Sequence, residues 1–152
     1  MLHSYHCHYE MHRIIKFALW TGARREEIHT LKWQNIHDGF CTVIGKGNKE
    51  RTIPLLPGAI EAIGPTKDIG YVFLRSHIDY YSKAFKRIAR DCAIEDISLH
   101  KLRHTSATKM LESGIGLSEV KEMLGHADIV TTQIYAQVLQ EHLRREMLKF
   151  KL

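Results

Sequence analysis

Residues 40–55 carry a β-hairpin pattern inside a chain whose other segments have helical periodicity. Phe40–Ile44 and Arg51–Leu55 are predicted to be strands, and Gly45-Lys46-Gly47-Asn48 supplies the turn residues between them. Pro54 and Pro57 are expected to end the hairpin, because proline cannot donate to a strand ladder. A small antiparallel sheet is therefore expected.

The other segments favour helices, several of them closed by glycine. Ile14 opens an apolar helix that is expected to stop at Thr21-Gly22, and Ser118 is the expected N-cap of a later helix. Further helices are predicted near residues 24–32, 59–63, 80–92, 99–111 and 117–124 and from residue 130. A third strand is expected at Tyr71–Leu74. The predicted class is mainly α (α+β), a helical domain with a small antiparallel three-stranded sheet.

Length and composition fit one ordinary soluble domain. The chain has 152 residues, of which 44% are hydrophobic and 26% charged. No apolar run reaches the roughly 18 residues that span a bilayer, and the N-terminus lacks a secretory signal pattern. Three widely spaced cysteines suit a reducing compartment, so a cytoplasmic protein with no membrane partner is predicted.

The positive charge is concentrated in one part of the chain. The formal net charge is +5, and residues 69–110 hold eight Lys/Arg against four Asp/Glu, which gives +4. This basic stripe indicates a polyanionic partner, nucleic acid first, or else a solvated helix face.

The first twelve residues are rich in histidine. His3, His6, His8 and His12 surround Cys7, and these residue types are metal ligands. A disordered leader over residues 1–12 is the preferred interpretation, and no metal site or cofactor is predicted.

Several side chains stand at helix ends or turns where they could act on a phosphate. Taken singly, each has an ordinary structural explanation, such as capping a helix, filling a polar niche or packing in the core. Together they supply two arginines for phosphate oxygens, two histidines for proton transfer, a lysine for a leaving oxygen and a tyrosine nucleophile. The set comprises Arg24, Lys46, His100, Arg103, His126 and Tyr135. No carboxylate pair has metal-binding spacing, and the glycine-rich hairpin lacks the spacing of a phosphate loop, so neither a two-metal nuclease nor ATP use is supported.

Five segments resemble, in order, the signatures of the tyrosine recombinase (phage integrase) family. They are residues 21–28 (TGARREEI), 44–51 (IGKGNKER), 100–105 (HKLRHT), 124–126 (LGH) and 131–135 (TTQIY). The resemblance implies a catalytic domain over residues 13–152 that cleaves and rejoins duplex DNA through a 3′-phosphotyrosyl intermediate, without metal or ATP.

The resemblance also implies roles for the phosphate-binding residues. Arg24 and Arg103 would hold the scissile phosphate, His126 would hydrogen-bond it, and Glu27 would help to place the site.

For the proton and bond transfers, the resemblance gives Tyr135 as the nucleophile, Lys46 as the acid that protonates the leaving 5′-oxygen, and His100 as the base.

The family resemblance further predicts partners and organisation. The full-length parent is expected to form a tetramer on double-stranded DNA through the C-terminal helix 138–150, and the family's N-terminal clamp domain is expected to be absent here. DNA contacts are expected from Lys49, Arg51, Arg87, Lys101 and Lys109.

Three alternatives remain open from the sequence. Leu117–His126 followed by another helix resembles a helix-turn-helix, which fits a DNA-binding fragment that performs no catalysis. A type IB topoisomerase shares the tyrosine chemistry. An interaction fragment could dock its C-terminal helix on another subunit.

Overall fold

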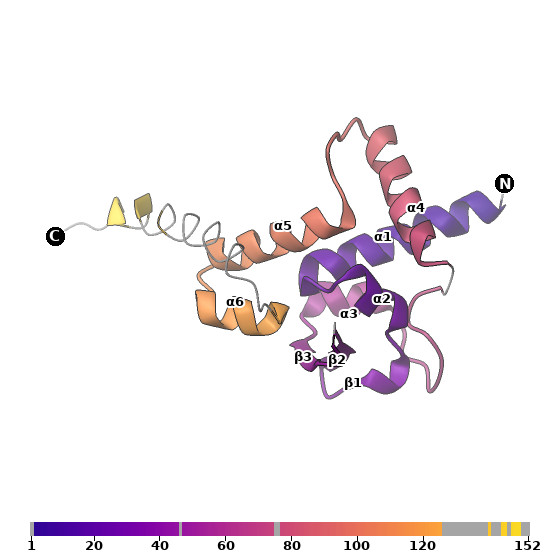
Figure 1. Cartoon of the computed structure of the whole chain (residues 1–152), viewed down its shortest axis with the longest axis horizontal. Coiled ribbons are helices and arrows are strands. Elements are labelled where there is room, and N and C mark those ends of the chain that lie inside the picture. The colour runs from indigo at the N-terminus through magenta and orange to yellow at the C-terminus, as the bar shows by residue number, and fades with distance from the viewer. Residues whose placement is uncertain are drawn as a thin grey trace.

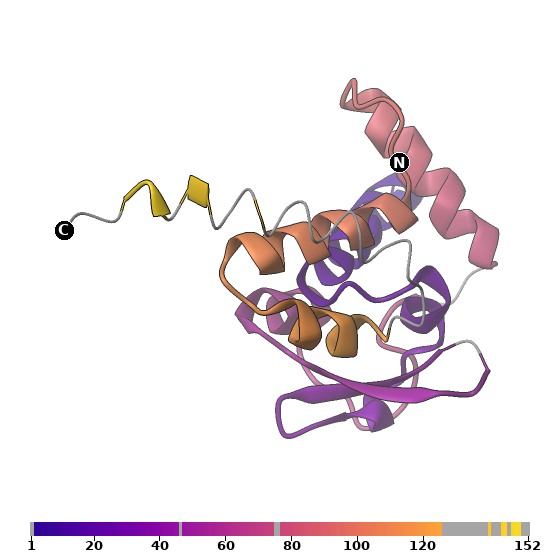
Figure 2. The same ribbon diagram turned by 60° about the vertical axis from the view of Figure 1, so that its left-hand side comes forward.

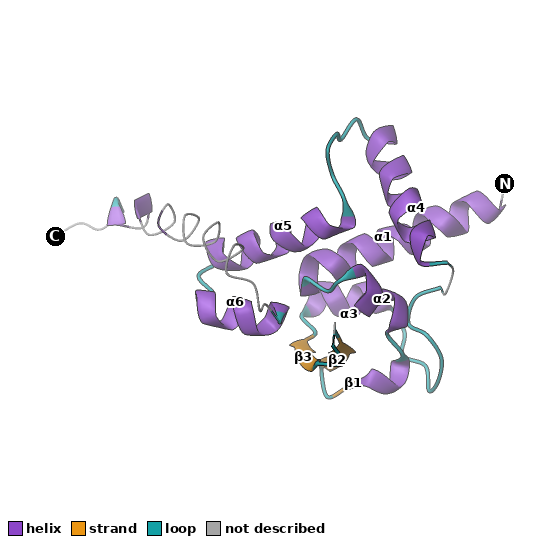
Figure 3. Cartoon of the chain, viewed as in Figure 1, coloured by secondary structure: helices purple, strands orange, loops and turns teal. Residues whose placement is uncertain are grey.

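The computed structural model describes residues 2–45, 47–74, 77–125, 140, 144–145 and 147–149, with the backbone alone for residues 2–7. Helices dominate, and a small sheet lies along one edge beneath them (Figures 1 and 3). The elements are α1 (Leu2–Thr21), α2 (Arg25–Thr30), the 3-10 turn η1 (Trp33–Asn35), β1 (Ile36–His37), β2 (Phe40–Ile44), β3 (Glu50–Pro54), α3 (Pro57–Ile63), α4 (Ile78–Asp91), α5 (Leu99–Glu112) and α6 (Leu117–Leu124).

The first helix corrects the expectation of a disordered leader over residues 1–12. α1 is continuous from Leu2 to Thr21. Met11, Ile14 and Ala18 follow at helical spacing and are all buried, so Met11 belongs to the same apolar stripe as the predicted helix from residue 14. The helix ends at Thr21-Gly22, as predicted, with Gly22 in the left-handed region at φ +62°.

The sheet is antiparallel and three-stranded, as predicted, but its third strand is not the expected one. The order is β1-β2-β3, so the third strand is Ile36–His37. His37 pairs with Phe40 across the two-residue turn Asp38-Gly39, whose φ angles are both positive. An Asp-Gly pair is a strong signal for such a tight hairpin, and the sequence interpretation overlooked it.

The segment predicted as a strand at Tyr71–Leu74 instead crosses α1. Arg13 donates to the carbonyls of Ala62, at 2.9 Å, and Val72, at 3.3 Å. The carboxylate of Glu10 accepts the Leu74 amide at 2.6 Å. These side-chain bonds hold the segment on the helix, and its ladder contact is one isolated bridge between Lys32 and Tyr71.

Most helix ends lie where the sequence places them. α5 ends at Ser113-Gly114, and Gly125 closes α6 in the left-handed region. The N-cap of α6 is Gly116 rather than Ser118, which lies inside the first turn. Pro57 begins α3, where its missing N–H costs nothing.

Two hydrophobic clusters support the fold. The larger joins α1, α3 and α4 to the inner face of the sheet, with Phe17 and Phe73 edge to face at its centre. The smaller joins α5 to α6 through residues such as Leu111 and Leu124. Figure 2 shows α5 beside α1 and the hairpin spread below both. The turn after α1 joins the two clusters, because Ala23 belongs to the larger one and Gly22 lies against Leu124 of the smaller one. In the part of the chain that the structure describes, no helix is both long enough and apolar enough to cross a bilayer.

Candidate active site

The site begins at the tight turn between α1 and α2. A Cβ on Gly22 would lie 2.3 Å from Leu124 Cδ2, so only glycine lets this turn approach α6 so closely. The Thr21 hydroxyl donates to the Phe17 carbonyl at 2.6 Å and accepts the Ala23 amide at 3.2 Å. The chain then enters α2 with Arg24 as the extended N-cap residue, which places its guanidinium at the helix start as predicted.

Glu27 is the buried anchor of this turn. Its side chain is 1% exposed, and it accepts the Arg24 amide at 2.6 Å and Arg24 Nη1 at 3.0 Å. Burial acts to raise the pKa of Glu27, but hydrogen bonds from Arg51 and the Arg24 amide outweigh it and hold the pKa below its usual range. The carboxylate is therefore ionised and holds both the backbone amide and the guanidinium of Arg24.

Arg51, predicted as a DNA contact, belongs to this buried network. Its side chain is 10% exposed and forms a bidentate pair with Glu27, with Nη2 at 2.8 Å from Oε2. Its Nε donates to the Met123 carbonyl at 2.8 Å. Strand alternation could have shown this, because Arg51 shares the inner face of β3 with buried Ile53.

Arg103 is buried beneath the same turn. It is 2% exposed and donates Nη1 to the Gly22 carbonyl at 2.6 Å and Nη2 to the Leu124 carbonyl. α5 therefore supplies the link between the end of α1 and the end of α6.

Three arginines thus converge on the last carbonyls of α6. Arg51 donates to Met123, Arg103 to Leu124, and Arg24 Nη2 to Gly125 at 3.2 Å. Helix C-termini carry unpaired carbonyls and partial negative charge, so they suit cationic donors. The arrangement holds three guanidinium groups from different elements close together.

A cavity of about 280 Å³ opens in front of this cluster and brings Arg24, His100 and Arg103 together. Arg25 and Ser82 also line it, and Arg25 Nη1 donates to the Ser82 hydroxyl at 2.8 Å. Neither was a predicted site residue. Arg25 follows Arg24 directly, yet a single arginine in a helix start carries no signal that separates it from a surface residue.

His100 is exposed at the first turn of α5 and packs against His104, with ring centroids 5.0 Å apart. Burial, together with the nearby positive charges of His100 and Arg103, lowers the pKa of His104 below its usual value. A proton on His100 therefore disfavours a proton on His104.

Lys46, His126 and Tyr135, predicted as acid, phosphate ligand and nucleophile, lie outside the described residues, as does most of the predicted helix 138–150. Of the predicted DNA contacts, Lys49 and Arg87 are exposed. Two others are exposed but paired with carboxylates, Lys101 with Asp96 at 2.6 Å and Lys109 with Glu112 at 2.8 Å. Among the described residues, no group of three His, Cys, Asp or Glu side chains could hold a metal ion.

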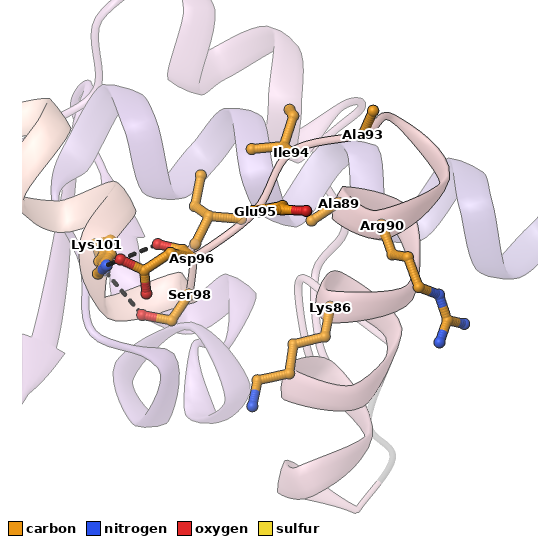
Figure 4. Close-up of a pocket in the computed structure, with 10 residues that line it drawn as sticks. Lys86, Ala89, Arg90, Ala93, Ile94, Glu95, Asp96, Ser98 and Lys101 are labelled. Atoms are coloured by element: carbon orange, nitrogen blue, oxygen red, sulfur yellow. Dashed lines mark hydrogen bonds and ion pairs between the residues drawn. The ribbon is translucent and has the colours of Figure 1, made fainter.

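A second hollow of about 530 Å³ adjoins the first, because Ser98 lines both. Figure 4 shows Lys86 and Arg90 projecting from α4 on one side and Lys101 on the other. Lys86 and Arg90 are four residues apart, hence on one helix face. Glu95 and Asp96 also line the hollow, and Asp96 pairs with Lys101, so the basic side chains without a carboxylate shown beside them in Figure 4 are Lys86 and Arg90 of α4.

Comparison with known sequences gives a consistent result. Residues 3–142 match the model of the phage integrase family. The chain is 40% identical to tyrosine recombinase XerD of Listeria monocytogenes (strain F2365), over 82% of this chain and 48% of that protein. It is 38% identical to tyrosine recombinase XerA of Pyrococcus furiosus, over 87% and 52%. The chain spans about half the length of these curated relatives.

Solved structures of integrases and recombinases have the same fold. The catalytic domain of bacteriophage HP1 integrase matches 91% of this chain and 80% of its own, with a TM-score of 0.70 and 28% identity. XerH recombinase, bound to its palindromic difH substrate in a post-cleavage complex, matches 91% and 45%, with a TM-score of 0.69 and 25% identity. A lambda integrase tetramer bound to a Holliday junction shares the fold, with a TM-score of 0.66 and 22% identity over 78% and 41%.

Proposed function

The chain belongs to the phage integrase family, and from that premise we propose that it is the catalytic domain of a tyrosine-type site-specific recombinase. Its substrate is duplex DNA. The observation that carries the proposal is the cavity in which Arg24, His100 and Arg103 meet in front of buried Glu27.

The cavity suits a phosphodiester. Guanidinium groups bind phosphate oxygens in fork geometry, and charge that builds on those oxygens during attack is stabilised by donors already in place. Arg103 is held by two carbonyls, and Arg24 by Glu27 and one carbonyl, so little reorganisation is needed when a phosphate enters.

The reaction follows from the roles that the family resemblance gives. The Tyr135 oxygen attacks the phosphorus and loses its proton to His100. The bond from phosphorus to the 5′-oxygen breaks, and Lys46 protonates that oxygen. The 3′-phosphotyrosyl link keeps the energy of the phosphodiester, so a 5′-hydroxyl can reverse the steps without ATP or metal. His126 hydrogen-bonds the phosphate.

The second hollow gives the DNA backbone a path away from the cavity. Lys86, Arg90 and Lys101 line it, and Ser98 connects it to the cavity. We propose that phosphates next to the scissile one lie along α4, in contact with Lys86 and Arg90.

The parent protein is proposed to act as a tetramer on DNA, as lambda integrase does on a Holliday junction, through its C-terminal helix 138–150. We also propose that it acts in the cytoplasm, as a bacterial, phage or mobile-element protein.

A covalent-trapping experiment tests the function. A library of randomised duplexes, each carrying one nick, is incubated with the chain, and adducts that survive denaturing detergent are recovered and sequenced. A recombinase gives adducts with a common sequence, and Tyr135→Phe gives none. Adducts without sequence preference, with relaxation of supercoiled plasmid, would favour a type IB topoisomerase. Binding without any adduct would favour a DNA-binding fragment that performs no catalysis.

A further inference from the structure

Arg51 holds an unusual position for a cation in a DNA-binding domain. Its guanidinium is turned away from solvent, against Glu27 on one side and the Met123 carbonyl on the other. It contacts α2 and the end of α6 from β3, and it does not line the cavity. Arg51 therefore reaches the phosphate site only through other residues.

Glu27 is the residue through which Arg51 reaches Arg24. The two carboxylate oxygens each accept from Arg51, and each also accepts from Arg24, through Nη1 and through the backbone amide. The oxygens cannot rotate toward one arginine without loosening the other. The orientation of Arg24 is thus tied to that of Arg51.

The second contact of Arg51 fixes the end of α6. The Met123 carbonyl that it binds lies two residues before the Gly125 carbonyl that Arg24 binds. A Cβ on Gly125 would lie 3.0 Å from Arg51 Cδ, so the aliphatic stem also packs against this turn. Arg51 therefore contacts Glu27 and the C-terminal turn of α6, the two features to which the Arg24 guanidinium is bound.

We propose that Arg51 is a positioning residue, which sets the orientation of Arg24 toward the scissile phosphate through Glu27 and the C-terminal turn of α6. The proposal rests on the proposed function for its effect on catalysis. The positioning itself is a property of the protein without DNA.

Removing Arg51 also changes how Glu27 responds to pH. The charged or titratable groups that face Glu27 are Arg24, its neighbour Glu26, Arg51 from β3 and Cys41 from β2. Without Arg51, Glu27 loses its bidentate partner while it stays buried, so protonation becomes easier. A protonated Glu27 accepts poorly from Arg24, so activity in the variant should fall as the solution becomes acidic.

The test compares Arg51→Met and Arg51→Lys with Lys67→Met, an exposed lysine outside the network. The DNA is the duplex recovered by covalent trapping, and the readouts are DNA affinity and the rate of adduct formation at saturating DNA from pH 5 to pH 8. Arg51→Met should keep its affinity and lose on the order of tenfold to a hundredfold in rate, because small misplacements of a catalytic group have that effect. Its rate should fall further toward pH 5. Arg51→Lys should recover part of the rate, and Lys67→Met should match the wild type.

A DNA contact gives the opposite pattern. If Arg51→Met lowers affinity and salt dependence but leaves the saturated rate and its pH profile unchanged, the positioning role is wrong. An unchanged rate and unchanged affinity also overturn it.

A second readout keeps the inference separate from the proposed function. The side-chain NMR resonance of Arg24 Nε, recorded without DNA, should shift and broaden in Arg51→Met and stay in place in Lys67→Met. If the wild type forms no adduct, the proposed function fails and the NMR result still decides the positioning. If Arg51→Met does not fold, the same measurements on Arg51→Lys decide it, because the shorter cation cannot form the bidentate pair. An unmoved Arg24 resonance overturns the inference.

Discussion

Glu27 is the residue whose loss should affect this domain most. It is buried, 1% exposed, and binds two arginines. Glu27→Gln leaves two guanidinium groups facing a neutral amide, and breaking a buried charge pair on one side costs about 3–5 kcal/mol. Urea denaturation should show a loss of that order in the free energy of unfolding. Glu26→Gln, at an exposed neighbouring carboxylate, is the control and should change it by less than about 0.5 kcal/mol.

The lowered pKa values of Glu27 and His104 predict acid sensitivity. In the folded chain the pKa of Glu27 lies below its unfolded value of about 4.3, so its stabilising effect is lost as pH falls below that value. The pKa of His104 is also lowered, so below about pH 6.5 the unfolded chain binds more protons than the folded chain. The free energy of unfolding should therefore begin to fall below about pH 6.5, and fall again below about 4.3. His104→Asn should weaken the first decline. An identical curve in that variant would contradict this origin.

The cysteines should differ in reactivity. Burial raises the pKa of Cys41 to about 12, whereas Cys92 is exposed. In a Cys7→Ser background, iodoacetamide at pH 8 should alkylate Cys92 in the native protein and both cysteines in urea, as measured by mass spectrometry. If Cys41 in the native protein is labelled as fast as Cys92, the buried side of β2 opens readily to solvent, which contradicts the prediction.

At the residue scale, the sequence analysis did not predict which arginines are buried. Arg24, His100 and Arg103, which the family resemblance groups together, line one cavity, and their catalytic roles stay predictions. Arg51 shows the limit, because an arginine between charged residues has the same composition signal whether it faces solvent or a buried carboxylate. The period of the strand is the signal that separates the two cases, because Arg51 stands two residues before buried Ile53 and pairs with buried Val43.

Among the elements, the turn that ends α1 should be the least tolerant of substitution. Gly22 has φ +62° and its missing side chain gives room to Leu124. Gly114, at the end of α5, has φ +91° with open space around it, so it is a matched control. Gly114→Ala should cost about 1 kcal/mol for the left-handed backbone alone. Gly22→Ala should cost more by about 1–3 kcal/mol, because a methyl is forced into packed atoms. Equal losses in urea midpoints would show that the turn can move away from α6.

Element boundaries were predictable wherever a local signal sets them. Glycine ends α1, α5 and α6, and the hairpin strands follow from the turn chemistry between them. The errors came from tertiary contacts. Residues 2–12 join α1 because Met11 meets the core, and residues 71–74 leave the sheet because Arg13 and Glu10 bind them from α1. No local pattern encodes those partners.

For the whole molecule, the placement of charge predicts how DNA binding responds to salt. Lys86 and Arg90 line the second hollow, whereas Lys67, in the loop after α3, lines neither. Each phosphate contact contributes about 0.9 to the slope of log affinity against log salt concentration. The double variant Lys86→Gln/Arg90→Gln should therefore make this negative slope shallower by about 1.8, and Lys67→Gln should leave the slope unchanged. Filter binding or fluorescence anisotropy at several salt concentrations measures this, and a double-variant slope equal to wild type would remove the proposed path along α4.

The convergence of three arginines on the end of α6 also has a consequence for the order of folding. Two of these bonds, from Arg24 to Gly125 and from Arg51 to Met123, join residues 101 and 72 positions apart. Contacts this distant in sequence form late, because a long loop must close first. During synthesis, before α6 has left the ribosome, Glu27, Arg24 and Arg51 lack the carbonyls at the end of α6 that the two arginines bind in the complete domain. The domain therefore completes its phosphate-binding arrangement only when α6 has docked on α2, β3 and α5.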